Sequence, residues 1–226
     1  MPIDKLIKKI TMETNNDSQK NNLSLINFKI IIVGDAGVGK TCLLKKASKG
    51  LFDEAYQPTL GFEFLTFECE IDDNPIKLQI WDTCGQETYK SLITSFYRNS
   101  ALAMMIYSID SKESFYHIES WLKDIKQQSN PDVKIFLIGN KADLGEEREV
   151  DIDKGKQFID ENNIDYFSET SAKSGLNVKE VFMKAAELLY KEYLKYRERA
   201  NSTEKKDIPT PVKVNNDKGQ RKSGCC

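Results

Sequence analysis

The sequence lacks the features that mark several classes of protein. No apolar run approaches the roughly 18 residues that a membrane-spanning helix needs. The first residues, MPIDKLIKKI, contain no long apolar segment followed by a small-residue cleavage site, so we do not expect a secretory signal there. The five cysteines, at positions 42, 69, 84, 225 and 226, show neither disulfide-framework nor paired zinc-ligand spacing, which favours a reducing cytosol. A net charge of −2 gives no sign of nucleic-acid binding.

Two shifts in composition divide the chain into three parts. Residues 11–27 are rich in Asn, Ser and Thr without an apolar period, so residues 1–27 are predicted to be a flexible extension. After about Arg199 large apolar residues almost disappear, which predicts a flexible tail over 199–226. Residues 28–198 remain as the folded domain.

Within that domain, short apolar runs alternate with segments of helical length. The runs 28–33, 101–109 and 134–140 are nearly continuous in apolar residues, as in strands covered on both faces. Residues 62–71 and 76–81 alternate and predict an antiparallel hairpin at a sheet edge. Helices are expected after Gly39 and over 111–128, 152–162 and 176–196, with Ser111 and Asp151 as N-caps. The pattern predicts an α/β fold: a doubly wound, six-stranded, mostly parallel sheet with one antiparallel edge strand and helices on both faces.

A phosphate-binding motif follows the first predicted strand. Residues 34–41, GDAGVGKT, fit the pattern G-x-x-x-x-G-K-[ST] between a strand and a helix. Glycines there let backbone N–H groups surround phosphate oxygens, and the helix adds its partial positive end. Lys40 can reach the β- and γ-phosphates, and the Thr41 hydroxyl can ligate Mg²⁺. The motif alone does not separate ATP from GTP.

Two further motifs, each after a strand, favour guanine. In NKAD (140–143), the Asp143 carboxylate can accept both N–H donors on the N1/N2 edge of guanine, a pair that adenine does not present. In ETSAK (169–173), backbone amides are placed to meet the guanine carbonyl oxygen. Each string alone fits an ordinary polar loop at a strand end; together and in order they indicate a guanine nucleotide.

With WDTCGQE (81–87), these motifs resemble the Ras superfamily of small GTPases over about residues 28–198. The resemblance implies that Asp82 holds Mg²⁺ through water, Gly85 senses the γ-phosphate and Gln86 orients the attacking water. It also implies that Thr59 is a second hydroxyl ligand of Mg²⁺, and that loss of the γ-phosphate releases both loops. The GTP- or GDP-binding residues that it implies are Gly34, Asp35, Ala36, Gly37, Val38, Gly39, Lys40, Thr41, Cys42, Phe52, Tyr56, Thr59, Asp82, Gly85, Asn140, Lys141, Asp143, Ser171, Ala172 and Lys173.

The C-terminal sequence SGCC is similar to the ends of Rab proteins, where two cysteines carry geranylgeranyl chains. A divergent Rab is therefore expected, lipid-anchored through Cys225 and Cys226 on the cytoplasmic face of a membrane, with a soluble pool. The family's effector-reading aromatic residues would be Phe64, Trp81 and Phe96, although these rings could instead pack the sheet edge. Other partners implied are an exchange factor and a GTPase-activating protein.

Several alternatives stay open at this stage. The main one is a GTP-binding scaffold or regulator of another Ras-superfamily branch with little turnover, and a small-metabolite kinase is a third. Cys84 is either a small filler or a redox-sensitive residue. Residues 3–10 are either disordered or a short membrane-interface helix. His117, the sole histidine, is expected at a helix surface without a catalytic role.

Overall fold

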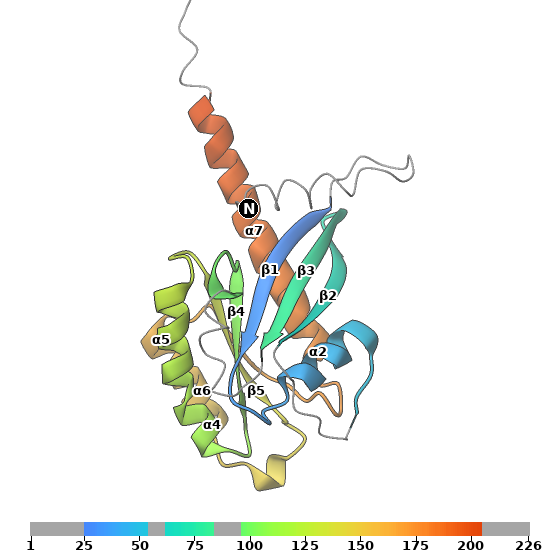
Figure 1. Cartoon of the computed structure of the whole chain (residues 1–226), viewed down its shortest axis with the longest axis vertical. Coiled ribbons are helices and arrows are strands. Elements are labelled where there is room, and N and C mark those ends of the chain that lie inside the picture. The colour runs from blue at the N-terminus through green and yellow to red at the C-terminus, as the bar shows by residue number, and fades with distance from the viewer. Residues whose placement is uncertain (1–24, 54–61, 84–95, 205–226) are drawn as a thin grey trace, which may run out of the picture. The chain divides into compact units, whose positions relative to one another are not determined.

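Short apolar runs of the sequence form a six-stranded sheet in a computed structural model, which describes residues 25–53, 62–83 and 96–204, with side chains to residue 199 (Figure 1). The strands are β1 (Ile26–Val33), β2 (Phe62–Ile71), β3 (Asn74–Thr83), β4 (Leu102–Ser108), β5 (Lys134–Asn140) and β6 (Tyr166–Glu169). The helices are α2 (Lys40–Lys49), α4 (Lys112–Tyr116), α5 (Ile118–Gln128), α6 (Ile152–Asn162) and α7 (Val178–Glu204), with a 3₁₀ turn η2 (Gly145–Glu147).

The strand order is β2-β3-β1-β4-β5-β6, and every neighbouring pair is parallel except β2–β3. This confirms the predicted doubly wound sheet with one antiparallel edge strand. Because the parallel strands run in one direction, their carboxyl ends meet at one edge of the sheet. The segments that leave this edge begin at Gly34, at residue 84 and at Ile109, Lys141 and Thr170.

The β2–β3 hairpin turns through Asp72 and Asp73, whose φ angles of 49° and 61° match the twist of the strands that they join. Pro75 lies inside β3 rather than in the turn. Pro75 pairs with Glu70 of β2, whereas the pairing of β3 with β1 begins at Ile76. Proline has no N–H to donate, but no residue of β1 lies opposite Pro75 to accept one.

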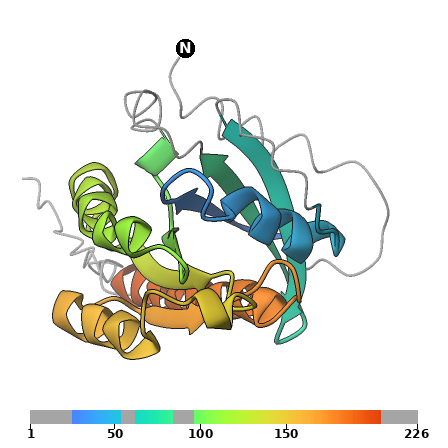
Figure 2. The ribbon, with the colours of Figure 1, turned by 90° about the horizontal axis from the view of Figure 1, so that it is seen from below.

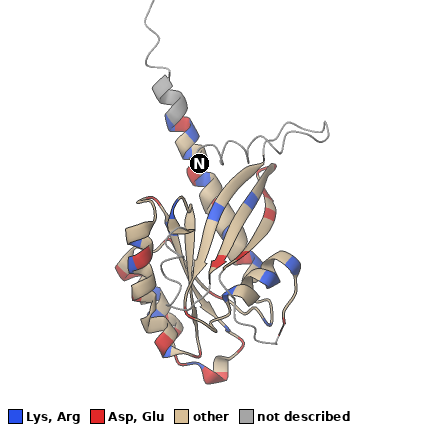
Figure 3. Cartoon of the chain, viewed as in Figure 1, with Lys and Arg blue, Asp and Glu red and all other residues tan. Residues whose placement is uncertain are grey.

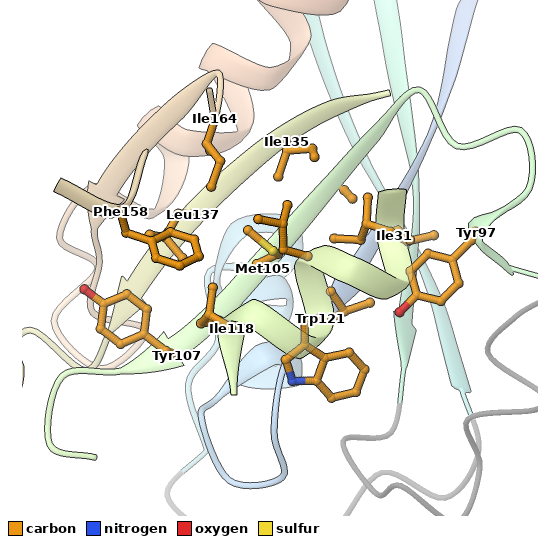
Figure 4. Close-up of a cluster of buried hydrophobic side chains, with 14 of the residues drawn as sticks. Ile31, Tyr97, Met105, Tyr107, Ile118, Trp121, Ile135, Leu137, Phe158 and Ile164 are labelled. Carbon is orange, nitrogen blue, oxygen red and sulfur yellow. The ribbon is translucent and has the colours of Figure 1, made fainter. Parts of the chain in front are cut away.

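Helices cover both faces of the sheet (Figures 1 and 2). On one face, Ile31, Met105 and Leu137 pack with Trp121 of α5 and Phe158 of α6 in a buried cluster (Figure 4). On the other face, α2 packs against β2 and β3, and the rings of Phe67 in β2 and Phe182 in α7 have centroids 5.5 Å apart. Charged residues concentrate on the helices, loops and hairpin (Figure 3).

Some boundaries differ from the sequence-based expectations. The helix expected over 111–128 is divided at His117 into α4 and α5, and the His117 carbonyl accepts both a 3₁₀-type bond from the Ser120 N–H (3.0 Å) and an α-helical bond from the Trp121 N–H (3.2 Å). Ser111 caps α4 as expected, whereas the Asp151 side chain makes no capping bond to α6. β1 starts at Ile26, inside the expected extension, and α7 continues to Glu204, past the expected start of the tail.

The chain divides into two units, residues 1–190 and 191–226. In the second unit the end of α7 carries its own surface contacts, a 2.8 Å ion pair between Lys195 and Glu192 and the Arg197 guanidinium 5.7 Å from the Tyr193 ring centroid. In the part of the chain that the structure describes, no helix has the length and apolar character to cross a membrane.

Candidate functional site

The loop Gly34–Gly39 makes a tight passage from β1 into α2. Gly34 (φ 142°) and Gly39 (φ 91°) have backbone conformations that favour glycine. A Cβ atom would lie 2.1 Å from the Ile106 carbonyl oxygen at Gly34 and 2.4 Å from the Asn140 amide nitrogen at Gly39. Both positions therefore exclude any side chain. Gly39, the N-cap residue of α2, has no side chain to make a capping bond, and the N-terminus of a helix favours an anion.

Lys40 is buried at the start of α2, with a residual exposure of 6%. Its ammonium donates hydrogen bonds to the main-chain oxygens of Gly34 (2.8 Å) and Asp35 (2.7 Å). These bonds hold a positive charge inside the turn of the loop, where phosphate oxygens were expected to bind. A buried ammonium bonded to neutral carbonyls keeps its full charge for an anionic ligand.

Asp82 lies at the end of β3 and is fully buried. Its Oδ2 accepts a hydrogen bond from the Thr41 hydroxyl, while its Oδ1 has no hydrogen-bond partner among the described residues. Burial raises the pKa of Asp82 from 3.8 to about 6, against the opposing effects of the Thr41 bond and of Lys40. A buried carboxylate oxygen without a partner, next to a hydroxyl, suits a hard cation that binds oxygen ligands and keeps several waters.

The side of the site where the base was expected is built from the ends of β5 and β6. The Asn140 amide donates to the Val38 carbonyl (2.8 Å) and its oxygen accepts from the Thr170 hydroxyl (3.1 Å), so Asn140 ties the phosphate loop to the 169–173 segment. The Ser171 hydroxyl lies 2.5 Å from Asp143 and also accepts the Ser174 N–H. The exposed Asp143 carboxylate is thereby oriented before any ligand binds.

Two side-chain pairs support these base-side loops. Lys141 has a left-handed backbone (φ 64°), and its ammonium lies 3.4 Å from Asp110. Arg148 binds both carboxylate oxygens of Glu169, at 2.6 and 2.8 Å, directly before Thr170. The Glu169 bond and charge raise the pKa of Arg148. Asp110 and Arg148 were not singled out from the sequence, because only their folded positions connect them to the motifs, and Thr170 lies inside the 169–173 motif but was given no role of its own.

The structure brings together the expected residues that it describes. Asp35, Val38, Lys40 and Thr41 lie in or beside the loop, and Asn140, Asp143 and Ser171 lie at the neighbouring strand ends. Around them, Ala36 and Lys173 are exposed, Ala172 is buried, and Cys42 and Phe52 are half-buried. Burial raises the pKa of the Cys42 thiol. Some of the predictions concern residues outside the part of the chain that the structure describes: Tyr56, Thr59, Cys84, Gly85, Gln86, Cys225, Cys226 and residues 3–10.

The three aromatic residues expected to read partners form one cluster with a fourth ring that the sequence did not single out. Phe62 lies 5.6 Å from Trp81 and 4.8 Å from Phe96 between ring centroids, and Phe64 lies 5.1 Å from Trp81. Phe62 and Phe64 are 53% and 45% exposed, whereas Trp81 and Phe96 pack against the buried core. The period of a strand places residues 62 and 64 on the same face, a signal that could have identified Phe62.

Asp35 also has partners that were not expected. Its carboxylate lies 2.6 Å from Nδ1 of His117 and accepts a 2.9 Å bond from the Trp121 indole. His117 is exposed at the helix surface as expected, and it also lies at the α4–α5 junction, where it contacts Asp35 of the phosphate loop.

Comparison with protein families gives one result. A family model described as Ras family matches residues 29–191, more than two thirds of the chain. The match begins in β1 and ends in α7, so it includes every loop of the site and all of the sheet except the first three residues of β1.

Proposed function

The chain belongs to the Ras family and is therefore a small GTP-binding switch protein with a P-loop GTPase fold and GTPase activity; we propose that it regulates intracellular membrane traffic in the manner of a Rab protein. The observation that carries the nucleotide assignment is the meeting of Lys40, Asp143 and Asp82 at one edge of the sheet, from three separate motifs. Each of them has the chemistry for one part of a guanine nucleotide–magnesium complex.

In this proposal the base is held by the strand-end loops. Asp143 accepts the N1 and N2 hydrogens of guanine, and the amides of Ser171, Ala172 and Lys173 donate to its carbonyl oxygen. Lys141 packs along the base, oriented by Asp110. The buried Asn140 joins the base side to the phosphate loop through Val38. Adenine would leave the Asp143 carboxylate without its donors, which costs several kcal/mol.

The phosphates are held by the loop Gly34–Thr41 and by Lys40. Thr41 and Asp82, with Thr59 from outside the described residues, fit Mg²⁺, because the Asp82 oxygen without a partner and the adjacent hydroxyl supply the oxygen donors that it prefers. When bound, Mg²⁺ neutralises charge on the phosphate oxygens. Lys40 adds a second positive charge there, and Gln86 orients the attacking water.

The proposal also includes a conformational switch driven by GTP hydrolysis and a lipid anchor to a membrane. Thr59 and Gly85 contact the γ-phosphate only in the GTP state, so hydrolysis releases the two loops that carry them. Partner proteins bind those loops together with the aromatic cluster of Phe62, Phe64, Trp81 and Phe96. The exposed rings of Phe62 and Phe64 provide an apolar contact for them. Geranylgeranyl chains on Cys225 and Cys226 anchor the protein to a membrane.

A competition experiment tests the nucleotide assignment. Full-length protein loaded with a fluorescent GDP should release it to excess GDP or GTP but not to ATP, and phosphate release from GTP should be slow until an activating protein is added. Equal competition by ATP would contradict guanine recognition. Absence of phosphate release even with a broad-specificity activating protein would favour a GTP-binding scaffold.

The membrane role is tested by imaging. Tagged full-length protein should concentrate on a membrane, whereas the Cys225→Ser/Cys226→Ser variant and a chain ending at Gly224 should be diffuse. Identical diffuse distributions of all three would contradict the lipid anchor.

A further inference from the structure

The junction between α4 and α5 is joined to the phosphate loop through Asp35. His117 ends α4 and begins α5, and its Nδ1 lies 2.6 Å from Oδ2 of Asp35. Trp121, one turn further along α5, donates to Oδ1 of the same carboxylate at 2.9 Å. Figure 2 shows the loop after β1 beside these helices.

Asp35 also contacts Lys40, the residue proposed to bind phosphate. Its main-chain oxygen accepts a 2.7 Å bond from the Lys40 ammonium. The side chain of Asp35 is 21% exposed and that of His117 is 46% exposed, so water screens the interaction between them in part. One residue therefore connects the helix junction, through its carboxylate, to the lysine, through its carbonyl.

A carboxylate in a phosphate-binding loop is electrostatically unfavourable. Its negative charge repels the phosphates that the loop has to hold, unless a positive charge compensates it. Trp121 stabilises the carboxylate by a hydrogen bond but brings no charge, and its ring is fixed in the buried cluster (Figure 4). A histidine can supply the charge, since histidine gains or loses a proton between about pH 5 and 8.

Two other carboxylates in the segments beside this junction have hydrogen-bond partners of their own. Glu149 accepts the N–H of Lys112 at the start of α4, and Asp110 pairs with Lys141 and accepts the Ser108 hydroxyl. The charged residues of the loop, of α4 and α5 and of the segments beside them are Asp35, Lys40, Asp110, Lys112, Glu113, Glu119, Lys123, Asp124, Lys126 and Glu149. Asp35 is the carboxylate that the structure places within hydrogen-bonding distance of the imidazole.

We propose that His117 is a positioning residue of the nucleotide site, which in its protonated form neutralises Asp35, holds the phosphate loop and slows nucleotide release. At higher pH the neutral ring leaves the Asp35 charge uncompensated, and the nucleotide leaves faster. This inference rests on the nucleotide assignment of the loop. It predicts tighter binding at mildly acidic pH, a property that the binding motifs alone do not imply.

The test is the release rate of fluorescent GDP from full-length protein in Mg²⁺ buffer between pH 6 and 8. In the wild type the rate should rise about 3- to 10-fold with pH, the effect of one partly exposed charge pair. His117→Asn keeps a hydrogen-bond donor that does not titrate, so its rate should vary less than 2-fold over this range. Asp35→Asn should flatten the profile in the same way, because the repelling charge is gone.

Trp121→Phe provides the matched control. It removes a neutral donor to the same carboxylate, so release should be faster at every pH with the wild-type slope preserved. A wild-type slope retained in His117→Asn would overturn the role of His117 alone. Wild-type protein that binds no guanine nucleotide at any pH would overturn the nucleotide assignment and this inference with it. Melting curves of each variant at pH 6 and 8 establish that the compared proteins are folded.

Discussion

The two ends of the site differ in how far they are complete without a ligand. At the base end, the described polar side chains satisfy one another: Asn140 bonds to Val38 and Thr170, and Asp143 to Ser171. At the phosphate end, the Lys40 ammonium donates hydrogen bonds to two main-chain carbonyls. The Asp82 carboxylate is buried there, and one of its oxygens has no hydrogen-bond partner among the described residues.

This difference assigns different tasks to the two ends. The base end is preorganised, so changes there should lower the stability of the nucleotide-free protein as well as its affinity. The phosphate end holds a buried ammonium and a buried carboxylate that suit a phosphate–magnesium ligand, so changes there should lower affinity while leaving nucleotide-free stability equal or higher. The variants below test this division, from the largest expected effect to the smallest.

Lys40→Ala should have the largest effect. The ammonium would make at least two charge-assisted bonds to phosphate, worth about 1.5–3 kcal/mol each, so GDP affinity should fall about 100- to 10,000-fold. Lys45→Ala is the matched control, because this lysine of the same helix is 43% exposed and pairs at 3.6 Å with Glu63. Titration with fluorescent GDP measures both. A loss of affinity below 10-fold would show that Lys40 is not the main phosphate cation.

Asp143→Ala should separate base recognition from phosphate binding. Inosine diphosphate lacks the N2 hydrogens of guanine, so the wild type should prefer GDP over it by about 10- to 100-fold, and the variant should lose most of that preference. Competition titrations with the two nucleotides give the ratio directly. Glu147→Ala, an exposed carboxylate four residues later, should leave the ratio unchanged. A preserved preference in Asp143→Ala would place guanine recognition elsewhere.

Most of the fold was predictable because its signals are local. Continuous apolar runs marked β4 and β5 within one residue at each end, and a largely alternating pattern marked β2 at both ends. The folded domain was predicted to start at residue 28, two residues after the observed start of β1, because Ile26 and Asn27 follow a polar stretch without a turn signal. The interruption at His117 was also missed, because its backbone remains near-helical and the sequence on both sides is helical.

The site was predictable where a motif holds its residues together in sequence, as in 34–41, 140–143 and 169–173. It was not predictable where the contact is made by folding. His117 and Asp35 are 82 positions apart, and Arg148 and Glu169 are 21 apart. Such pairs depend on which strand ends are neighbours in the sheet, which hydrophobic periodicity does not specify.

Asp82→Asn tests the unbalanced charge at the phosphate end. Without Mg²⁺, the folded protein holds the Asp82 proton more tightly than the unfolded chain, since the pKa rises from 3.8 to about 6. The resulting cost is absent below about pH 4, grows between pH 4 and 6 and is constant above, at about 3 kcal/mol. In EDTA at pH 7.5, Asp82→Asn should therefore be as stable as the wild type or more stable in urea unfolding.

The same variant should lose function. Added Mg²⁺ should slow GDP release from the wild type about 10-fold or more and have little effect on Asp82→Asn, because a neutral amide is a weaker ligand for this cation. Glu63→Gln, which changes the carboxylate opposite Asp82 in the hairpin, should retain the Mg²⁺ effect. A marked loss of nucleotide-free stability in Asp82→Asn would contradict the proposed difference between the two ends.

Arg148→Ala is expected to have the smallest effect and examines the base end. The Arg148 side chain is 26% exposed and that of Glu169 only 11%, so removal of the arginine leaves a largely buried carboxylate without its bidentate partner. The free energy of unfolding should fall by about 1–2 kcal/mol, which corresponds to a drop of about 2–8 °C in Tm for a domain of this size. Lys156→Ala, which removes an exposed partner of Asp153, should change Tm by less than about 1 °C. If the base end is preorganised by this pair, the nucleotide-free and GDP-bound forms should both melt earlier, since the scaffold is lost in both states. A decrease confined to the GDP-bound form would instead mean that Glu169 becomes ordered only when the base binds, and the two ends of the site would then differ in chemistry but not in preorganisation.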